Sequence, residues 1–182
     1  MWNDIKKIVD DRKASDIDRL IVKLDHVAYR VKKGERLTLI GELMNILPYR
    51  EFKNFKVIRA NAITTCIKLH ETLPVFVVSE GLSEDSIVEQ YCQKYGSRVH
   101  HFAYLVKDIE KVVEIQKKRG IDFTSEDIIG SIDEGIKQIF TFPTGTTNHI
   151  IEYIQRFGDF DGFFTPSNIK ELMESTGKLI EA

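Results

Sequence analysis

The chain has 182 residues, a length that suits one domain or two small fused modules. Its 42% hydrophobic content and formal net charge of −2 are ordinary for a globular protein, and neither predicts binding to nucleic acid or to an anionic membrane surface. Cys66 and Cys92 lack CxxC spacing, the N-terminus has no apolar signal core, and no apolar run approaches membrane-spanning length, which together favour a reducing, cytoplasmic location.

The first 20 residues are highly charged, and their apolar side chains have the spacing of a helix with a break near Ala14. We treat residues 1–20 as an N-terminal helical extension. Two interpretations are open for it. It is either an arm that binds a partner or, as we favour, a helix packed over the edge of the domain.

Residues 21–80 have the patterns of one strand, one helix and three further strands. The strands are expected at about 21–31, 50–58, 62–70 and 74–79, and the helix at 35–47, with an apolar side formed by Leu39, Ile40, Leu43, Ile46 and Leu47. Residues 81–97 follow as a linker helix. Ser83 is a good N-cap for it and Ser86 is the alternative.

The same order of elements returns in residues 98–157. A strand from residue 98 leads to a helix that begins after Asp108 and ends before Gly120, both residues that suit helix ends. Further strands are expected at about 121–125, 135–142 and 147–155. Residues 158–182 are expected to form a C-terminal helical tail. The pattern predicts an α+β fold built from two βαβββ modules in one compact domain.

Two stretches of the chain repeat each other at a fixed spacing. Residues 24–33 are LDHVAYRVKK and residues 99–108 are VHHFAYLVKD, so that His26 corresponds to His101 and Ala28 to Ala103 at an offset of 101 − 26 = 75 residues. Because strand side chains alternate between faces, each histidine shares a face with its small alanine. This alternation also makes His101, and not His100, the equivalent of His26.

A third candidate ligand lies in the last predicted strand, where Glu152 stands within the apolar run HIIEYIQR. An ionised carboxylate there is costly unless it is paired or bound to a metal, and a salt bridge to Arg30 or Arg156 is the alternative. Two imidazoles and one carboxylate form the facial triad of non-haem Fe(II) sites, although the same ligands also accept Mn, Co, Ni or Zn. Val77 occupies the position equivalent to Glu152, so three protein ligands are expected.

At this point the sequence resembles the vicinal oxygen chelate superfamily, whose members pair βαβββ modules around a metal cleft in an open-barrel sheet. Within it, LDHVAYRV, KQIFTFPTG and IIEYIQRFG are similar to stretches of the catalytic C-terminal half of 4-hydroxyphenylpyruvate dioxygenases. The resemblance implies His26, His101 and Glu152 as iron ligands and Gln138 as a catalytic residue. It also implies a substrate pocket that includes Phe140 and Ile150, with Phe163 or Phe164 and Ile169 on a closing C-terminal helix.

The chain also departs from that family. His100 replaces a pocket glutamine, Ile150 replaces a pocket phenylalanine, and Ile169 stands where an aromatic residue is expected, so a hydroxyphenyl substrate is not indicated. A second resemblance, over LSEDSIVEQYCQKYGSRVHHFAYLVKDIE, is to methylmalonyl-CoA epimerases. Those enzymes normally have an additional glutamine ligand in the first module, and residues 61–70 contain no glutamine.

Three functions therefore compete for this sequence. The first is a non-haem Fe(II) dioxygenase acting on a small 2-oxo acid or a similar chelating molecule, and it is the one we favour. The second is an oxygen-independent epimerase or lyase with Glu71 or Glu80 as weak candidates for its base, and the third is a non-catalytic binding module.

Arg30 shares the face of His26 and suits a substrate carboxylate, although a solvated strand end also explains it. His70 and His149 are expected at the surface. The edge strands and the N-terminal helix are compatible with a homodimer.

Overall fold

The computed structural model describes residues 2–158, which form four helices, two short 3-10 helices and eight strands. The strands are β1 (Ile21–Val31), β2 (Arg50–Val57), β3 (Ala62–Lys68), β4 (Val75–Gly81), β5 (Arg98–Val106), β6 (Ile129–Ser131), β7 (Ile136–Phe140) and β8 (Ile150–Arg156). The helices are α1 (Trp2–Ala14), α2 (Arg36–Ile46), α3 (Ile87–Tyr95) and α4 (Ile109–Lys118), with 3-10 turns at Ile17–Arg19 and Ile58–Ala60.

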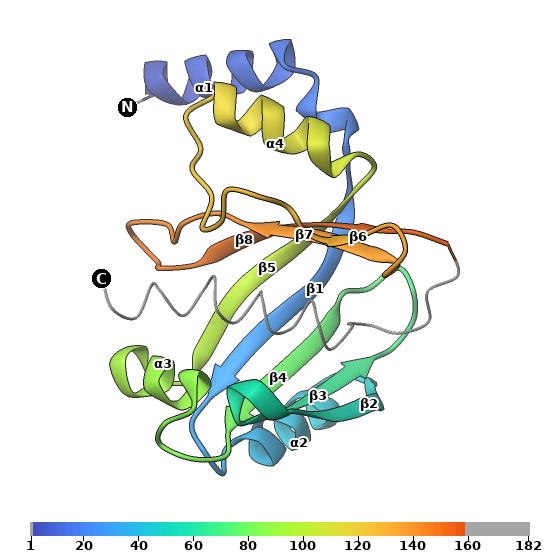
Figure 1. Ribbon diagram of the computed structural model, residues 1–182, viewed down its shortest axis with the longest axis vertical. Coiled ribbons are helices and arrows are strands. Elements are labelled where there is room, and N and C mark those ends of the chain that lie inside the picture. Colours follow the sequence, from blue (N-terminus) through green and yellow to red (C-terminus); the bar gives the residue numbers. More distant parts are fainter. Residues whose placement is uncertain (1, 159–182) are drawn as a thin grey trace.

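All eight strands belong to one mixed, strongly curled sheet with the order β2-β3-β4-β1-β5-β8-β7-β6 (Figure 1). The two central strands, β1 and β5, are antiparallel, whereas β1 pairs in parallel with β4 and β5 pairs in parallel with β8. Read outward from the centre, the first module runs β1-β4-β3-β2 and the second runs β5-β8-β7-β6, so equivalent strands occupy equivalent positions. The α+β class and the repeated βαβββ order that the sequence predicts are confirmed.

The strand register confirms the internal duplication residue by residue. His26 lies opposite Ala103, and Ala28 lies opposite His101, which is the exchange expected of a local two-fold axis between β1 and β5. Directly opposed residues have Cβ atoms about 5 Å apart, so a methyl group opposite each imidazole leaves space in the sheet for the ring. The alanines of the repeat thus make room for the histidines of the other copy.

Each module packs its own helix against the outer face of the sheet. The side chains of α2 cover Val31, Ile67 and Val78, and the side chains of α4 cover Val106 and Ile139. Burial of an aliphatic side chain of this size contributes about 1.5–3 kcal/mol, so the two clusters fix both helices. The concave face is left for a third group of side chains, which includes the candidate ligands.

The N-terminal extension differs from the packing that we favour from the sequence. In α1 the side chains of Ile5 and Ile8 remain 45% and 56% exposed, so this helix does not pack its apolar side over the domain. The attachment is made instead by Ile17, which is buried, and by Leu20, which packs against the α4 cluster. The exposed α1 therefore keeps the partner-binding interpretation open.

Two local expectations are wrong. No strand forms at 121–125 within the described part of the chain; Phe123 makes only an isolated bridge with Thr141, and the second strand of the second module is β6. Ile46, expected on the packed side of α2, is 76% exposed. The expected helix at the C-terminal end lies outside residues 2–158, as do Phe163, Phe164 and Ile169.

None of the helices described between residues 2 and 158 has the length and apolar character needed to cross a bilayer.

Helix α3 begins at Ser86, the alternative N-cap of the two considered. The Ser86 hydroxyl accepts a hydrogen bond from the Val88 amide and donates one to the Ala60 carbonyl oxygen, and the residue is buried. Ser83 lies outside the helix and contacts the side chains of Asn61 and Asp85. The cap therefore also joins α3 to the 3-10 turn between β2 and β3.

We expect Ser86→Ala to lower the free energy of unfolding by about 1–2 kcal/mol, because both the helix cap and a buried hydrogen bond are lost. Chemical denaturation measures the change. Ser83→Ala is the matched control and should cost less, since its hydroxyl is at a half-buried surface position. Equal losses for the two variants would contradict the assignment of the cap.

Candidate metal centre

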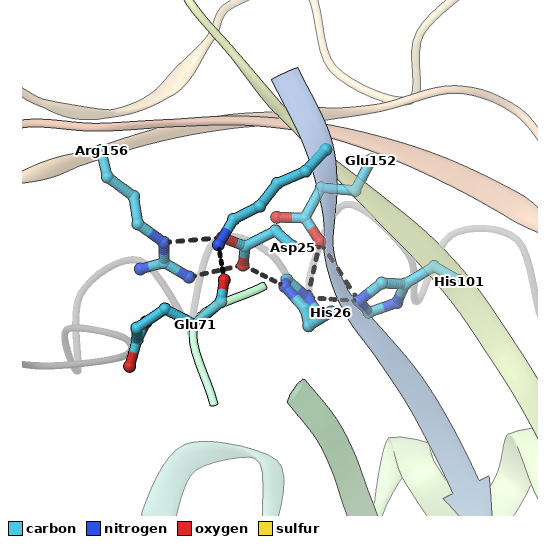
Figure 2. A network of polar contacts seen from close by, with 7 residues as sticks. Asp25, His26, Glu71, His101, Glu152 and Arg156 are labelled. Carbon is cyan, nitrogen blue, oxygen red and sulfur yellow. Dashed lines mark hydrogen bonds and ion pairs between the residues drawn. The ribbon is translucent and has the colours of Figure 1, made fainter. Parts of the chain in front are cut away.

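Three polar side chains from three strands meet on the concave side of the sheet (Figure 2). The Nε2 atom of His26 on β1 lies 3.2 Å from Nε2 of His101 on β5 and 3.1 Å from Oε2 of Glu152 on β8. The third side of this triangle, from His101 Nε2 to Glu152 Oε2, is 3.2 Å. His26 and Glu152 have no exposed side-chain surface, and His101 is also buried. The structure thus brings together the three residues that the sequence predicts as metal ligands.

Strand pairing explains why these residues converge. Glu152 lies opposite Ala103 on β5, two residues from His101, and opposite Phe140 on β7. In the first module the same position belongs to Val77, which lies opposite Ala28. The local symmetry therefore supplies two histidines but only one carboxylate. Among residues 2–158, no fourth histidine, cysteine or acidic side chain joins the group.

The charges of the three groups are set by their burial and by one another. Burial alone raises the pKa of Glu152, but the two histidines beside it reverse this effect and lower the pKa to about 2. Burial alone lowers the pKa of His26, but Glu152 and Asp25 outweigh it and raise the pKa to about 9. The pKa of His101 is lowered, chiefly by burial. At neutral pH the metal-free cluster therefore holds an ionised Glu152, a protonated His26 and a neutral His101.

The distances within the triangle test whether a metal ion fits. Three ligands bound at about 2.1 Å in adjacent octahedral positions lie about 3.0 Å apart, whereas tetrahedral ligands lie about 3.4 Å apart. The observed separations of 3.1, 3.2 and 3.2 Å lie between these two values, so one ion can contact all three atoms. Neither oxygen of Glu152 forms a hydrogen bond of regular geometry with a described residue, although Oε2 is within ion-pair distance of both imidazoles. The donor set and its spacing fit a facial triad.

Each candidate histidine has a partner on its other ring nitrogen. Nδ1 of His26 lies 2.9 Å from Oδ1 of Asp25, and Nδ1 of His101 lies 2.8 Å from Nδ1 of His100. The ring of His100 also packs edge-on against Tyr91 of α3. Metal-bound histidines commonly donate their second N–H in this way, which fixes the ring and its tautomer.

Sequence reasoning missed Asp25 and its partner Arg156. Simple alternation places Asp25 on the opposite face of β1 from His26. The register between β1 and β5 shifts between Leu24 and His26, and this irregularity allows neighbouring side chains to reach the same site. The acidic residue directly before the histidine in LDHV was the only available signal. Arg156 pairs with Asp25, while the carboxylate of Glu152 lies within ion-pair distance of His26 and His101.

The structure also places the predicted pocket residues of β7 and β8 beside the triad. Phe140 is fully buried, and its ring lies edge-on to His101 with the ring centres 5.4 Å apart. Ile150 packs against Phe140 in one apolar cluster. Gln138 is fully buried two residues along β7 from Phe140, and neither polar atom of its amide has a hydrogen-bond partner among the described residues.

Arg30 is not the solvated strand end that we consider from the sequence. It is buried, with its guanidinium carbon 5.0 Å from the centre of the Tyr91 ring. Burial lowers its pKa to about 10, and its positive charge contributes to lowering the pKa of both His100 and His101. His70 is exposed, as expected, and His149 is partly exposed with its ring against Phe102.

Two cavities lie away from these residues. One of about 360 Å³ is lined by residues beside α4, including Gln116 and Tyr153, and one of about 380 Å³ by residues beside α2, including Leu39 and Glu42. None of the three candidate ligands lines either cavity. Both lie on the helix-covered side of the sheet, whereas the three candidate ligands face its concave side.

Comparison with models of known protein families finds no match. Two curated relatives are similar over about two-thirds of this chain. Hemolysin VllY of Vibrio vulnificus (strain CMCP6) is 27% identical over 128 residues, which are 65% of this chain and 35% of the relative. A 4-hydroxyphenylpyruvate dioxygenase of Pseudomonas aeruginosa is 23% identical over 124 residues, which cover 65% of this chain and 34% of the relative. The chain thus spans about a third of the length of these relatives.

Solved structures match over a larger part of the chain. A mutant of 4-hydroxymandelate synthase from Streptomyces coelicolor has a TM-score of 0.73 at 22% identity, covering 88% of this chain and 54% of that one. A methylmalonyl-CoA epimerase has a TM-score of 0.62 at 22% identity, covering 76% of this chain and 98% of that one. The chain has the vicinal oxygen chelate fold. The epimerase from Mycobacterium tuberculosis matches similarly, with a TM-score of 0.62 at 16% identity, 76% of this chain and 91% of that one.

The vicinal oxygen chelate fold is the fold that the resemblance of the sequence implies. Both enzyme types that the sequence resembles, a dioxygenase and an epimerase, occur among the similar proteins. Their likeness establishes the architecture. The choice between their chemistries rests on the residues of the site itself.

Metal binding to the triad should depend on pH, because a proton and a cation compete for Nε2 of His26. With the pKa of His26 raised to about 9 in the metal-free protein, the competing proton is present below pH 9 and absent above it. The apparent affinity should therefore rise about tenfold per pH unit from pH 6.5 towards 9 and then level off.

Calorimetry of metal binding in buffers of different ionisation enthalpy counts the protons released. We expect close to one proton per metal ion at pH 7.5. Binding that releases no proton would show that His26 is already neutral in the metal-free protein.

Proposed function

We propose that this protein is a metal-dependent enzyme in which His26, His101 and Glu152 hold Fe(II), and that it acts on a 2-oxo acid or a similar chelating small molecule in a dioxygenase-type reaction. The observation that carries this proposal is the buried triangle of two imidazole nitrogens and one carboxylate oxygen, with sides of 3.1–3.2 Å. Three protein ligands in this arrangement leave the other side of an octahedral ion open.

The bound Fe(II) supplies open positions for a chelating substrate and the redox chemistry that activates dioxygen. The protein residues supply orientation and a dry environment. Glu152 and the histidines stand on three adjacent strands of one sheet, so that their side chains are held without support from a loop. Sites on such rigid elements keep their geometry within narrow limits.

The amide of Gln138 is well suited to orient a polar substrate. It is fully buried, and neither its Oε1 nor its Nε2 has a hydrogen-bond partner among the described residues. Leaving such a group without partners costs about 1–3 kcal/mol, so its retention in the interior calls for a function. A bound carboxylate or hydroxyl group would satisfy the amide and be oriented by it.

Apolar side chains form the other walls of the proposed pocket. Phe140 lies against the His101 ring, and Ile150 packs on Phe140, so these two side chains exclude water beside the ligands. Arg30 places a buried positive charge close enough to act on His101, which favours an anionic substrate such as a carboxylic acid. Loss of water strengthens these electrostatic effects at the centre.

An oxygen-independent epimerase or lyase is the second candidate. One observation favours it: the aligned part of this chain covers 98% of a methylmalonyl-CoA epimerase but only about a third of the dioxygenase relative. Against it, the two acidic residues considered as a base are placed poorly. Glu80 forms an ion pair with Arg36, and the Glu71 side chain is 85% exposed.

An anaerobic titration tests the proposed function. The metal-free protein receives one equivalent of Fe(II) and then a panel of 2-oxo acids while the visible spectrum is recorded. We expect a charge-transfer band with at least one acid, its loss in His101→Ala, and its decay when air is admitted. His70→Ala, which removes an exposed histidine, is the matched control and should keep the band.

The other outcomes separate the candidates. Tight metal binding without a band for any acid, combined with turnover that consumes no oxygen, would favour the epimerase or lyase. Metal and ligand binding without turnover would favour a binding module. Failure of the wild-type protein to bind any of Fe, Mn, Co, Ni or Zn would overturn the metal site and leave the three residues as a buried ion-pair cluster.

A substitution of Gln138 separates a role in substrate binding from a role in folding. Gln138→Met keeps the side-chain volume and removes the amide, so the metal-free protein should become more stable by about 1–3 kcal/mol. Binding of the 2-oxo acid should weaken by about tenfold, because a hydrogen bond to the substrate is lost. Denaturation and titration of the visible band measure the two effects. A less stable variant with unchanged binding would show that Gln138 is structural.

A further inference from the structure

A partly buried ion pair lies beside one of the candidate metal ligands, His26 (Figure 2). Arg156 at the end of β8 contacts Asp25 on β1 through two hydrogen bonds, Nε to Oδ2 at 3.0 Å and an Nη atom to Oδ1 at 2.8 Å. The side chains of Asp25 and Arg156 are 8% and 21% exposed. This two-point arrangement is the strongest geometry for an arginine and a carboxylate, and it fixes the plane of the carboxylate.

The same carboxylate also contacts His26. Its Oδ1 atom lies 2.9 Å from Nδ1 of the ring, and Nδ1–H donates because an ionised carboxylate can only accept. A proton on Nδ1 of a neutral imidazole leaves the lone pair on Nε2. Nε2 is the atom that points towards His101 and Glu152, so Asp25 selects the tautomer that can bind a cation at the centre.

The pair also joins the two modules. Asp25 and His26 belong to β1 in the first module, whereas Arg156 and Glu152 belong to β8 in the second, and β5 lies between these strands in the sheet. Arg156 follows Glu152 by four residues, so alternation puts both side chains on the concave face. The candidate ligand Glu152 and the arginine that contacts Asp25 are therefore held by the same strand, β8.

We propose that Asp25 and Arg156 are positioning residues that orient His26 for metal binding, with Arg156 fixing Asp25 and Asp25 fixing the ring. This inference rests on the proposed metal site. The second histidine has a weaker counterpart of this support, since Nδ1 of His101 contacts the neutral imidazole of His100 at 2.8 Å. The two ligand histidines are thus held unequally, by an anion in one module and by an uncharged ring in the other.

The test is metal affinity, measured in the full chain by competition with a chelator for Co(II), and the visible spectrum of the Co(II) form. Asp25→Asn keeps the shape of the side chain but removes its charge and the ion pair. We expect the Asp25→Asn protein to bind Co(II) about 10–100-fold more weakly and to show an altered spectrum, as is usual when the partner of a metal-bound histidine is changed. Arg156→Gln leaves the Asp25 contact in place and should weaken binding by a smaller factor.

Glu80→Gln provides the matched control. Glu80 on β4 forms a comparably buried ion pair with Arg36 on α2, with side-chain exposures of 13% and 8%, but neither residue contacts a candidate ligand in the described structure. Its removal should leave Co(II) affinity and spectrum unchanged. A similar loss in Glu80→Gln would overturn the proposal, because general destabilisation would then explain the effect.

The remaining outcomes distinguish this inference from the proposed function. If the wild-type protein binds Co(II) and Asp25→Asn binds it within a factor of two, the positioning role is wrong while the metal site stands. If the wild-type protein binds no metal, the metal site itself is wrong. A larger loss in Arg156→Gln than in Asp25→Asn would reverse the proposed order of action and contradict the inference.

Discussion

The ionised carboxylate of Glu152 lies in the interior of the sheet with no exposed surface, on a residue that is opposite Ala103 of β5 and Phe140 of β7. Burial of such an ion costs several kcal/mol even after the protein relaxes around it. In this chain the cost is offset by the two imidazoles at 3.1 and 3.2 Å, which hold the pKa of Glu152 at about 2. This contact therefore joins β1, β5 and β8 through their side chains, in addition to their backbone pairing.

Duplication explains how so few residues create the site. A two-fold arrangement of β1 and β5 brings one histidine from each copy to the axis, and the alanine of the other copy opposite each ring gives it space. Two histidines alone give a symmetric pair. Glu152 opposite Ala103, where the first copy has Val77 opposite Ala28, breaks that symmetry and completes the group of three candidate ligands.

The sequence predicts most of this architecture because the repeat at an offset of 75 residues fixes the register of both modules at once. Prediction fails where local irregularity replaces alternation. The register shift beside His26 brings Asp25 to the ring, and no periodic pattern can indicate such a shift. The predicted position of the second strand of the second module is also wrong, because β6 has only three residues and lies beyond a segment where Phe123 makes a single bridge. The burial of Arg30 depends on Tyr91 of α3, which is 61 positions away in the chain (91 − 30).

Nε2 of His26, Nε2 of His101 and Oε2 of Glu152 share a proton in the metal-free cluster, whereas a cation would take its place in the proposed metal site. With the pKa of His26 at about 9, a proton on Nε2 lies between Glu152 and His101 at neutral pH, where a divalent cation would otherwise lie. Asp25 accepts from Nδ1 in both states, so the ring keeps its orientation when the proton leaves. Binding of a cation at the proposed site would therefore exchange one proton for one metal ion in a triangle of atoms that is already formed.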